Sequence, residues 1–131
     1  MTRTSTTSGS PYEDSIGFCR AVRAGNIITV AGTGPIGTDG KTAAPGDAYG
    51  QAKRCLEIMV HAIADLGGAP EDVVRTRMYV VNIEDWQAVG RAHGEVFGAI
   101  KPSATMVAVN RLIGEDWLVE IEADCVVGEN E

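Results

Sequence analysis

The segment with the greatest capacity for chemistry is an alternating run near the C-terminus, from Trp117 to Val127. Glu120, Glu122 and Asp124 occupy alternate positions there, between apolar or small residues. Alternate residues of a β-strand share a face, so these carboxylates lie together on one face of a sheet. Like charges this close repel unless a partner or water reaches them, and the candidate partners are Arg75 and Arg77. Such a carboxylate is either a solvated or ion-paired group, or one that positions and activates water.

Cysteine and histidine offer two further chemistries, nucleophilic catalysis and metal binding. Cys19, Cys55 and Cys125 are odd in number and lack CxxC spacing, which argues against a disulfide framework and a zinc knuckle. No base or helix start lies beside Cys19, so a small core hydrophobe is favoured over a nucleophile. His93 is interpreted as a hydrogen-bonded core or interface residue and His61 as a surface residue. We therefore expect no metal site and no cofactor.

Motifs for phosphate binding and serine catalysis are absent from the sequence. The glycines around Gly32-Thr33-Gly34 are not followed by a helix or by Gly-Lys-Ser/Thr, and no Gly-x-Ser-x-Gly occurs. The net charge of −7 and the pI of about 4.8 come without any cluster of lysine and arginine. Nucleic acid and anionic membrane are therefore not expected as partners.

The size of the chain predicts one domain with one core. It has 131 residues, of which 44% are hydrophobic and 22% are charged. No apolar run approaches the ~20 residues needed to cross a bilayer. Residues 1–12 are rich in threonine and serine and lack the apolar stretch of a signal peptide, so we expect a flexible tail there. Residues 13–131 form the predicted domain, and the reduced cysteines favour a cytoplasmic location.

The hydrophobic pattern predicts an alternation of strands and helices. Residues 18–23 and 27–31 form a predicted hairpin around Ala24-Gly25-Asn26. Asp47 caps a helix whose apolar stripe runs to Leu66, and Gly67-Gly68 ends it. A strand at 74–81 precedes a second helix, capped by Asn82 and closed by Pro102. The inner stripe predicted for this helix consists of Trp86, Val89, His93 and Phe97.

Two more strands, at 105–109 and 117–127, complete a β-β-α-β-α-β-β order. Each helix has one apolar stripe, so both can cover one face of a mixed sheet in a two-layer α+β sandwich. On the predicted strand at 74–81, one face carries Val74, Thr76, Met78 and Val80, and the other carries Arg75, Arg77 and Tyr79. The opposite sheet face is half apolar, which suggests that another subunit covers it.

A set of short segments carries a resemblance that spans the chain from about residue 16 to residue 127. The segments are Ile16-Gly17, Ile28-Thr29-Val30-Ala31-Gly32, Asp72-Val73-Val74-Arg75-Thr76, Pro102, Arg111-Leu112 and Val119-Glu120-Ile121-Glu122-Ala123. In their order and spacing they resemble the Rid family (reactive intermediate deaminases, formerly YjgF, often labelled endoribonuclease L-PSP). The resemblance implies the chorismate-mutase-like fold and a homotrimer with ligand clefts between subunits.

The resemblance also implies roles for individual residues. In the deaminases of this family an arginine binds the substrate carboxylate and a glutamate positions water. Glu120 matches the glutamate, and Gly32 matches a glycine at the end of the second strand. The remaining polar positions have changed. The arginine position is Ala104, and the tyrosine, serine, cysteine and asparagine positions are Cys19, Ala31, Met106 and Gly90. With Phe18 and Thr105, these residues form the predicted cleft of an arginine-lacking subgroup.

Two functions follow as hypotheses. The first is a small-molecule hydrolase acting on an imine, an enamine or a related reactive carbonyl intermediate. Its substrate choice is altered, because loss of the arginine removes a charge-assisted bond of about 1.5–3 kcal/mol. The alternative is a non-catalytic trimeric module that binds a metabolite or a partner. Ribonuclease activity, which appears in the family's naming, is disfavoured by the acidic balance of the chain.

Overall fold

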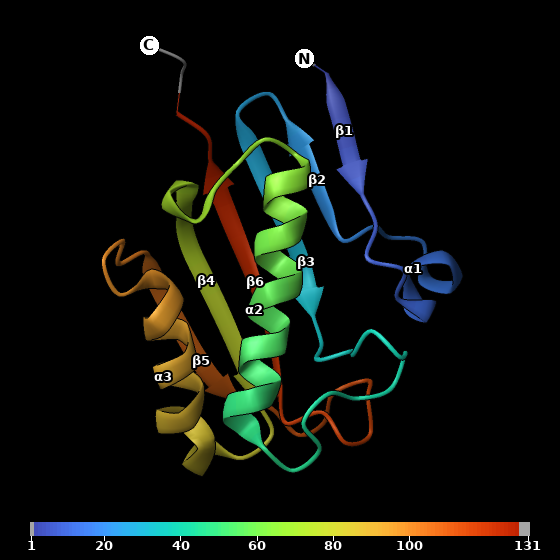
Figure 1. Ribbon diagram of the computed structural model, residues 1–131, viewed down its shortest axis with the longest axis vertical. Coiled ribbons are helices and arrows are strands. Elements are labelled where there is room, and N and C mark those ends of the chain that lie inside the picture. Colours follow the sequence, from blue (N-terminus) through green and yellow to red (C-terminus); the bar gives the residue numbers. More distant parts are fainter. Residues whose placement is uncertain (1, 129–131) are drawn as a thin grey trace.

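Two long helices cover one face of a mixed six-stranded sheet (Figure 1). The computed structural model describes residues 2–128. The strand order is β1-β2-β3-β6-β4-β5, and every neighbouring pair is antiparallel except the parallel pair β4–β5. The strands are β1 (Arg3–Thr6), β2 (Ala21–Ala24), β3 (Ile27–Thr33), β4 (Val73–Val80), β5 (Ser103–Ala108) and β6 (Val119–Val126). The helices are α1 (Pro11–Ile16), α2 (Ala48–Asp65) and α3 (Trp86–Phe97), with short 3₁₀ turns η1 (Pro70–Asp72) and η2 (Ile83–Asp85). The predicted two-layer α+β sandwich is confirmed.

Helix α2 follows the predicted pattern closely. The Asp47 side chain accepts a hydrogen bond from the backbone N–H of Gly50, which caps the helix start. The predicted apolar stripe is buried against β3 and β6, and it comprises Ala48, Ala52, Leu56, Met59, Ile63 and Leu66. The helix ends at Asp65, and Gly67 just beyond its cap has a φ of 85°, a left-handed conformation that glycine adopts without a steric penalty. None of the described helices is long and apolar enough to span a membrane.

The N-terminal segment differs from the flexible tail predicted for residues 1–12. Arg3–Thr6 form β1, which adds an antiparallel edge strand to β2. Ser10 then caps α1, which ends at Gly17 with a φ of 96°. Threonine favours extended backbone, and the N–H and C=O groups at the free edge of β2 provide the pairing partner. This partner is not visible in the tail's own composition.

One residue of the predicted strand face, Val74, and one of the predicted inner helix stripe, Trp86, are exposed. Val74 is 47% exposed, because an extra residue in β4 between Val73 and Arg75 shifts the register against β6, so Val73 is buried in its place. Trp86 is 55% exposed, because it stands at the first position of α3, beyond the core. The other residues of that predicted stripe lie inward, with Val89 and Phe97 buried and His93 partly buried.

Trp117 is buried, and it lies in the loop before β6 and not in the strand predicted for residues 117–127. Its ring packs so closely over Gly34 and Gly114 that a Cβ on either glycine would come within 2.4 Å of ring atoms. The edge of the ring meets Tyr12 of α1, with the ring centroids 5.9 Å apart. The indole thus connects α1 and the loop after β3 to the loop before β6.

The buried side chain of Gln51 ties α2 to the chain that enters β6. Its Oε1 accepts a hydrogen bond from Leu118 N–H at 2.7 Å, and its Nε2 donates to the Asp116 carbonyl at 3.1 Å. We predict that Gln51→Leu lowers the free energy of unfolding by about 1–3 kcal/mol, because backbone groups lose their partners. Urea denaturation at fixed protein concentration measures this. The same change at exposed Gln87 of α3 is the control, and an equal effect there would contradict the assignment.

Candidate functional site

Glu120 lies on the face of the sheet that the helices leave uncovered. Its neighbours along β6, Val119 and Ile121, are fully buried on the helix side, so the alternation of the strand directs Glu120 to the opposite face. In the ladder Glu120 stands beside Tyr79 of β4. On its other side β3 carries one extra residue between Val30 and Thr33, which is a β-bulge.

The bulge brings the backbone of Gly32 against the carboxylate of Glu120. A Cβ built on Gly32 would lie 2.1 Å from Oε2 and 3.1 Å from Cδ of Glu120. Any side chain at residue 32 would therefore displace the carboxylate. This close approach explains why glycine stands at the end of the second strand, where the family resemblance expects it.

The carboxylate of Glu120 is partly buried and makes no hydrogen bond to any other residue in the described part of the chain. Burial raises the pKa of Glu120, the charge of Arg20 lowers it, and the charge of Glu122 raises it, so that the net pKa lies above the usual value. A carboxylate without a partner and with a raised pKa retains both its lone pairs and its basicity for a ligand or a water molecule.

The other carboxylates on this face have partners. Tyr79 donates its hydroxyl to Glu122 at 2.5 Å, which together with burial raises the pKa of Tyr79. Arg77 lies 3.2 Å from Asp124 and 3.9 Å from Glu122. Arg77 is therefore a partner of the acidic strand, as predicted, whereas Arg75 forms no ion pair with the residues described here. Glu120 is the carboxylate of the alternating run that these groups leave free.

Arg20 donates hydrogen bonds to residues of the bulge, and the sequence analysis did not identify this role. It is only 4% exposed, and its Nη1 donates to the Gly32 carbonyl at 2.7 Å and to Thr33 Oγ1 at 3.1 Å. Its Nη2 pairs with buried Glu13 at 3.3 Å. The only sequence signal was an arginine at the entrance to an apolar strand, a pattern that a solvated arginine produces equally well.

Glu13 completes this buried pair from the short helix α1. Burial raises its pKa, but hydrogen bonds from Ser8 and Thr7 and the charge of Arg20 outweigh that effect, so the net pKa is lowered. The ionised pair connects the N-terminal segment to the bulge in β3. The segment predicted as a tail is therefore part of the scaffold of the site.

The predicted cleft residues fall into two groups. Phe18, Cys19 and Ala31 line a cavity of about 380 Å³ on the uncovered face, together with Glu122 and Asp124. Gly32 and Glu120 stand at the adjoining bulge. This first group lies on β3, on β6 and on the chain leading into β2.

The second group lies at the other edge of the sheet. Gly90 is on α3, and Ala104 and Met106 pair with Thr76 and Met78, so they face the helix side. Thr105 alternates with them and faces the uncovered side. Strand spacings of about 4.8 Å put β5 about 14 Å from β3 and about 10 Å from β6, and the two groups lie mostly on opposite faces. One protomer cannot assemble them into one cleft.

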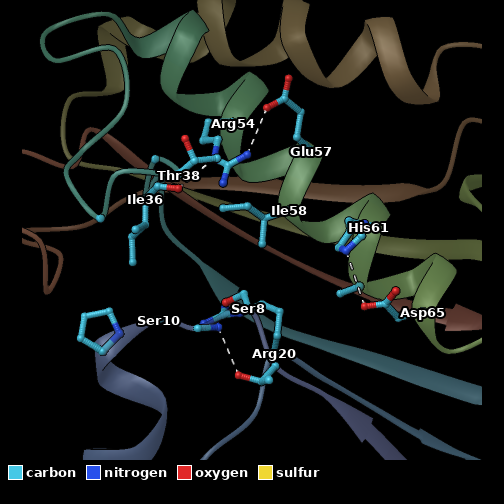
Figure 2. A pocket seen from close by; sticks show the side chains of 16 residues that line it. Ser8, Ser10, Arg20, Ile36, Thr38, Arg54, Glu57, Ile58, His61 and Asp65 are labelled. Atoms are coloured by element: carbon cyan, nitrogen blue, oxygen red, sulfur yellow. Dashed lines mark hydrogen bonds and ion pairs between the residues drawn. The ribbon is translucent and has the colours of Figure 1, made fainter.

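A further cavity of about 410 Å³ lies between α2 and the segment that joins β1 to α1 (Figure 2). Its charged groups are already paired. Arg54 donates to the Ile36 carbonyl at 2.8 Å and lies 3.5 Å from Glu57, and His61 lies 3.7 Å from Asp65. No group of three metal-ligating His, Cys, Asp or Glu side chains occurs among residues 2–128.

The three cysteines are free thiols. Burial raises the pKa of the Cys55 thiol well above its usual range and that of the Cys125 thiol to about 11. Both are therefore uncharged core residues. Cys19 is partly exposed, and its Sγ lies 3.5 Å from the Ala21 carbonyl.

A model of the endoribonuclease L-PSP family matches residues 12–127 of the chain. The chain belongs to that family, the YjgF/Rid family of the sequence resemblance. The crystal structure of Rv2704 from Mycobacterium tuberculosis, a member of the YjgF/YER057c/UK114 family, superposes with a TM-score of 0.87 at 41% identity. That match covers 96% of this chain and 100% of the other. YjgF from Escherichia coli superposes with a TM-score of 0.81 at 28% identity, covering 95% and 98% of the two chains.

A functionally named relative of this YjgF/Rid protein is the 3-aminoacrylate deaminase RutC of Acinetobacter baylyi. It is 30% identical over 104 residues, which are 79% of this chain and 82% of the relative. An uncharacterised protein of Streptomyces coelicolor is 41% identical over 121 residues, covering 92% and 90% of the two chains. These matches span nearly the whole predicted domain.

The raised pKa of Glu120 has a consequence for stability. The folded protein holds the Glu120 proton to higher pH than the unfolded chain does, so ionisation above about pH 4.5 costs stability. We predict that Glu120→Gln raises the melting temperature near neutral pH and that the gain disappears below about pH 4.5. Thermal unfolding across pH measures this. Glu122→Gln, which weakens the bond to Tyr79, should instead destabilise, and an equal gain in both variants would contradict the prediction.

Proposed function

We propose that this YjgF/Rid protein is a small-molecule hydrolase whose working carboxylate is Glu120. The substrate class is an imine, an enamine or a related reactive carbonyl compound, bound in a cleft between subunits. The observation that carries the proposal is the unpartnered carboxylate of Glu120, set against Gly32 and raised in pKa. The relationship to a 3-aminoacrylate deaminase supports the reaction class.

The proposed reaction needs one acid–base group from the protein. Water adds to the carbon of a protonated C=N bond, and Glu120 accepts a proton as the C–O bond forms. The resulting carbinolamine passes its proton to nitrogen and releases ammonia or an amine, which leaves a carbonyl product. A carboxylate whose pKa lies above the usual range is a stronger base for the first step and can return the proton in the second.

Ala104 sets the proposed choice of substrate. Where the resemblance expects a guanidinium, this chain has a methyl group, which places it in an arginine-lacking subgroup. A substrate carboxylate would lose its bidentate charged partner there. Together with Phe18, Cys19 and Met106, this change favours a less polar ligand than an ordinary imino acid.

The cleft requires a second protomer in this proposal. Within one chain, the strands of the Glu120 group lie about 10–14 Å from the strand of Ala104, two or three strand spacings away and mostly on the other face. In a homotrimer the β5 edge of one subunit would approach the uncovered sheet face of the next. The half-apolar character of that face supports the assembly.

The alternative remains a non-catalytic trimeric module that binds a metabolite or a partner. The observation in its favour is that the arginine, tyrosine, serine and asparagine positions of the resemblance hold Ala104, Cys19, Ala31 and Gly90. In that case Glu120 would accept hydrogen bonds from a bound ligand without turning it over. Turnover assays of matched variants separate the two functions.

We predict weak or absent hydrolysis of 2-iminobutanoate and faster hydrolysis of imines that lack a carboxylate. An amino-acid oxidase or an amine oxidase generates each imine, and its decay is followed with and without the protein. On the responsive imine, Glu120→Gln should lower turnover by about 10²–10⁴-fold and binding much less.

Glu122→Gln is the matched control for this assay. Equal and small effects of the two variants would favour the binding-module alternative. Strong acceleration of 2-iminobutanoate would mean that another guanidinium, that of Arg111 or of a neighbouring subunit, replaces the missing one.

We predict a homotrimer that buries more than about 2,000 Å² in total at its interfaces. Light scattering in moderate salt should give three times the mass of the 13.8 kDa chain. Thr105→Glu adds an acid to the uncovered face and should dissociate the assembly, whereas Gln87→Glu on the exposed side of α3 should not. A stable folded monomer of the parent protein at micromolar concentration would overturn the proposal.

A further inference from the structure

His93 occupies a defined position between α3 and the β4–β5 pair. Its Nε2 lies 2.8 Å from Oγ1 of Thr76, a residue with no exposed surface. Its ring rests against Phe97, with the centroids 4.8 Å apart and the planes tilted by 48°. The hydrogen bond to Thr76 of β4 and the contact with Phe97 of α3 together fix the orientation of the imidazole.

The partner of His93 lies directly beside Ala104. Thr76 and Ala104 are paired residues of the parallel strands β4 and β5, so their side chains stand next to each other on the helix side of the sheet. Ala104 is exposed. The imidazole therefore bonds the residue that stands beside the position where the family resemblance expects an arginine.

The surroundings of His93 leave room for a ligand. A Cβ at Gly90 or at Gly94, both on α3, would meet no atom within 4 Å. The second ring nitrogen, Nδ1, has no hydrogen-bond partner among the described residues. No buried side-chain nitrogen or oxygen in that part of the chain lacks a partner, so Nδ1 reaches solvent. His93 therefore carries one oriented, solvent-accessible polar atom, and positions 90 and 94 of the same helix carry no side chain.

We propose that His93 is the ligand-selecting residue on the Ala104 side of the cleft, where its Nδ1 hydrogen-bonds an uncharged polar group. The inference rests on the proposed intersubunit cleft for its setting, but not on catalysis. The ligand class is a compound with an amide, carbonyl or hydroxyl group in the place of a carboxylate.

The charge state of His93 favours an uncharged partner. Burial lowers the pKa of His93, so the ring is neutral at about pH 7. The side chains that contact it, Thr76 of β4 and Phe97 of α3, are uncharged, and so is Ala104, the β5 neighbour of Thr76. A neutral imidazole gives one oriented hydrogen bond and no charge compensation, so it discriminates against a carboxylate that a guanidinium would prefer.

Nuclear magnetic resonance of the full-length protein tests this directly, because the chain has two histidines and the other, His61, lies on the exposed side of α2. The probes are 2-oxobutanamide and 2-oxobutanoate, which share a carbon skeleton and differ in the charge of one group. At about pH 7.5 we expect the amide to shift the His93 ring signals saturably, with at least about tenfold higher affinity than the carboxylate. The His61 signals should not move.

Variants separate selection from folding. His93→Phe should lower amide affinity about tenfold, and His93→Gln, which keeps a hydrogen-bonding group, should retain most of it. Ala104→Arg at the exposed edge should invert the preference toward the carboxylate. His61→Gln is the matched control and should change neither affinity. Thermal unfolding and light scattering verify that each variant remains folded and assembled.

Several results would overturn the inference. They are equal or tighter binding of the carboxylate by the parent protein, amide binding that leaves the His93 signals in place, or no saturable shift with either probe up to about 50 mM. Failure of the hydrolase proposal gives a different result. In that case the amide preference persists while no imine is turned over, and Glu120→Gln leaves the His93 shifts unchanged.

Discussion

The contact between the backbone of Gly32 and the carboxylate of Glu120 determines the geometry of the candidate site. It exists because β3 carries an extra residue that forms a bulge. The buried guanidinium of Arg20 donates a hydrogen bond to the Gly32 carbonyl of this bulge. Arg20 is in turn neutralised by Glu13, which arrives from the N-terminal segment. Breaking a buried ion pair from one side leaves an uncompensated charge, which typically costs about 3–5 kcal/mol. The N-terminal segment, the bulge and the candidate carboxylate are therefore energetically connected.

The three carboxylates in one row on this sheet face are not all paired. The Tyr79 hydroxyl and the Arg77 guanidinium satisfy Glu122 and Asp124, and neither reaches Glu120. A structural role for the acidic row would predict pairing along its whole length. Leaving Glu120 unpaired, next to a glycine that gives it space, carries a desolvation cost that a ligand or a bound water can offset.

The two halves of the predicted cleft differ in what they offer a ligand. The Glu120 side provides a basic carboxylate and the thiol and aromatic groups of Cys19 and Phe18. The Ala104 side provides a neutral imidazole and small side chains. In the proposed cleft, a weaker and more directional contact would take the place of the charged anchor that the family resemblance expects. Scaffold and selectivity are separable because the sheet provides the first and a few side chains at its edge provide the second.

The order of elements, the α2 stripe and the alternation of β6 could be read from the sequence, because local periodicity and capping residues encode them. The family and the position of Glu120 were equally accessible, since both depend on short segments at fixed spacing. Arg20, the strand β1 and the bulges at Gly32 and Val74 were not, because each depends on a partner that is distant in the chain. The same reason hid the surroundings of His93. A helical histidine on an apolar stripe looks like a core residue until β4 and β5 place Thr76 and Ala104 beside it, and only the tertiary structure decides that neighbourhood.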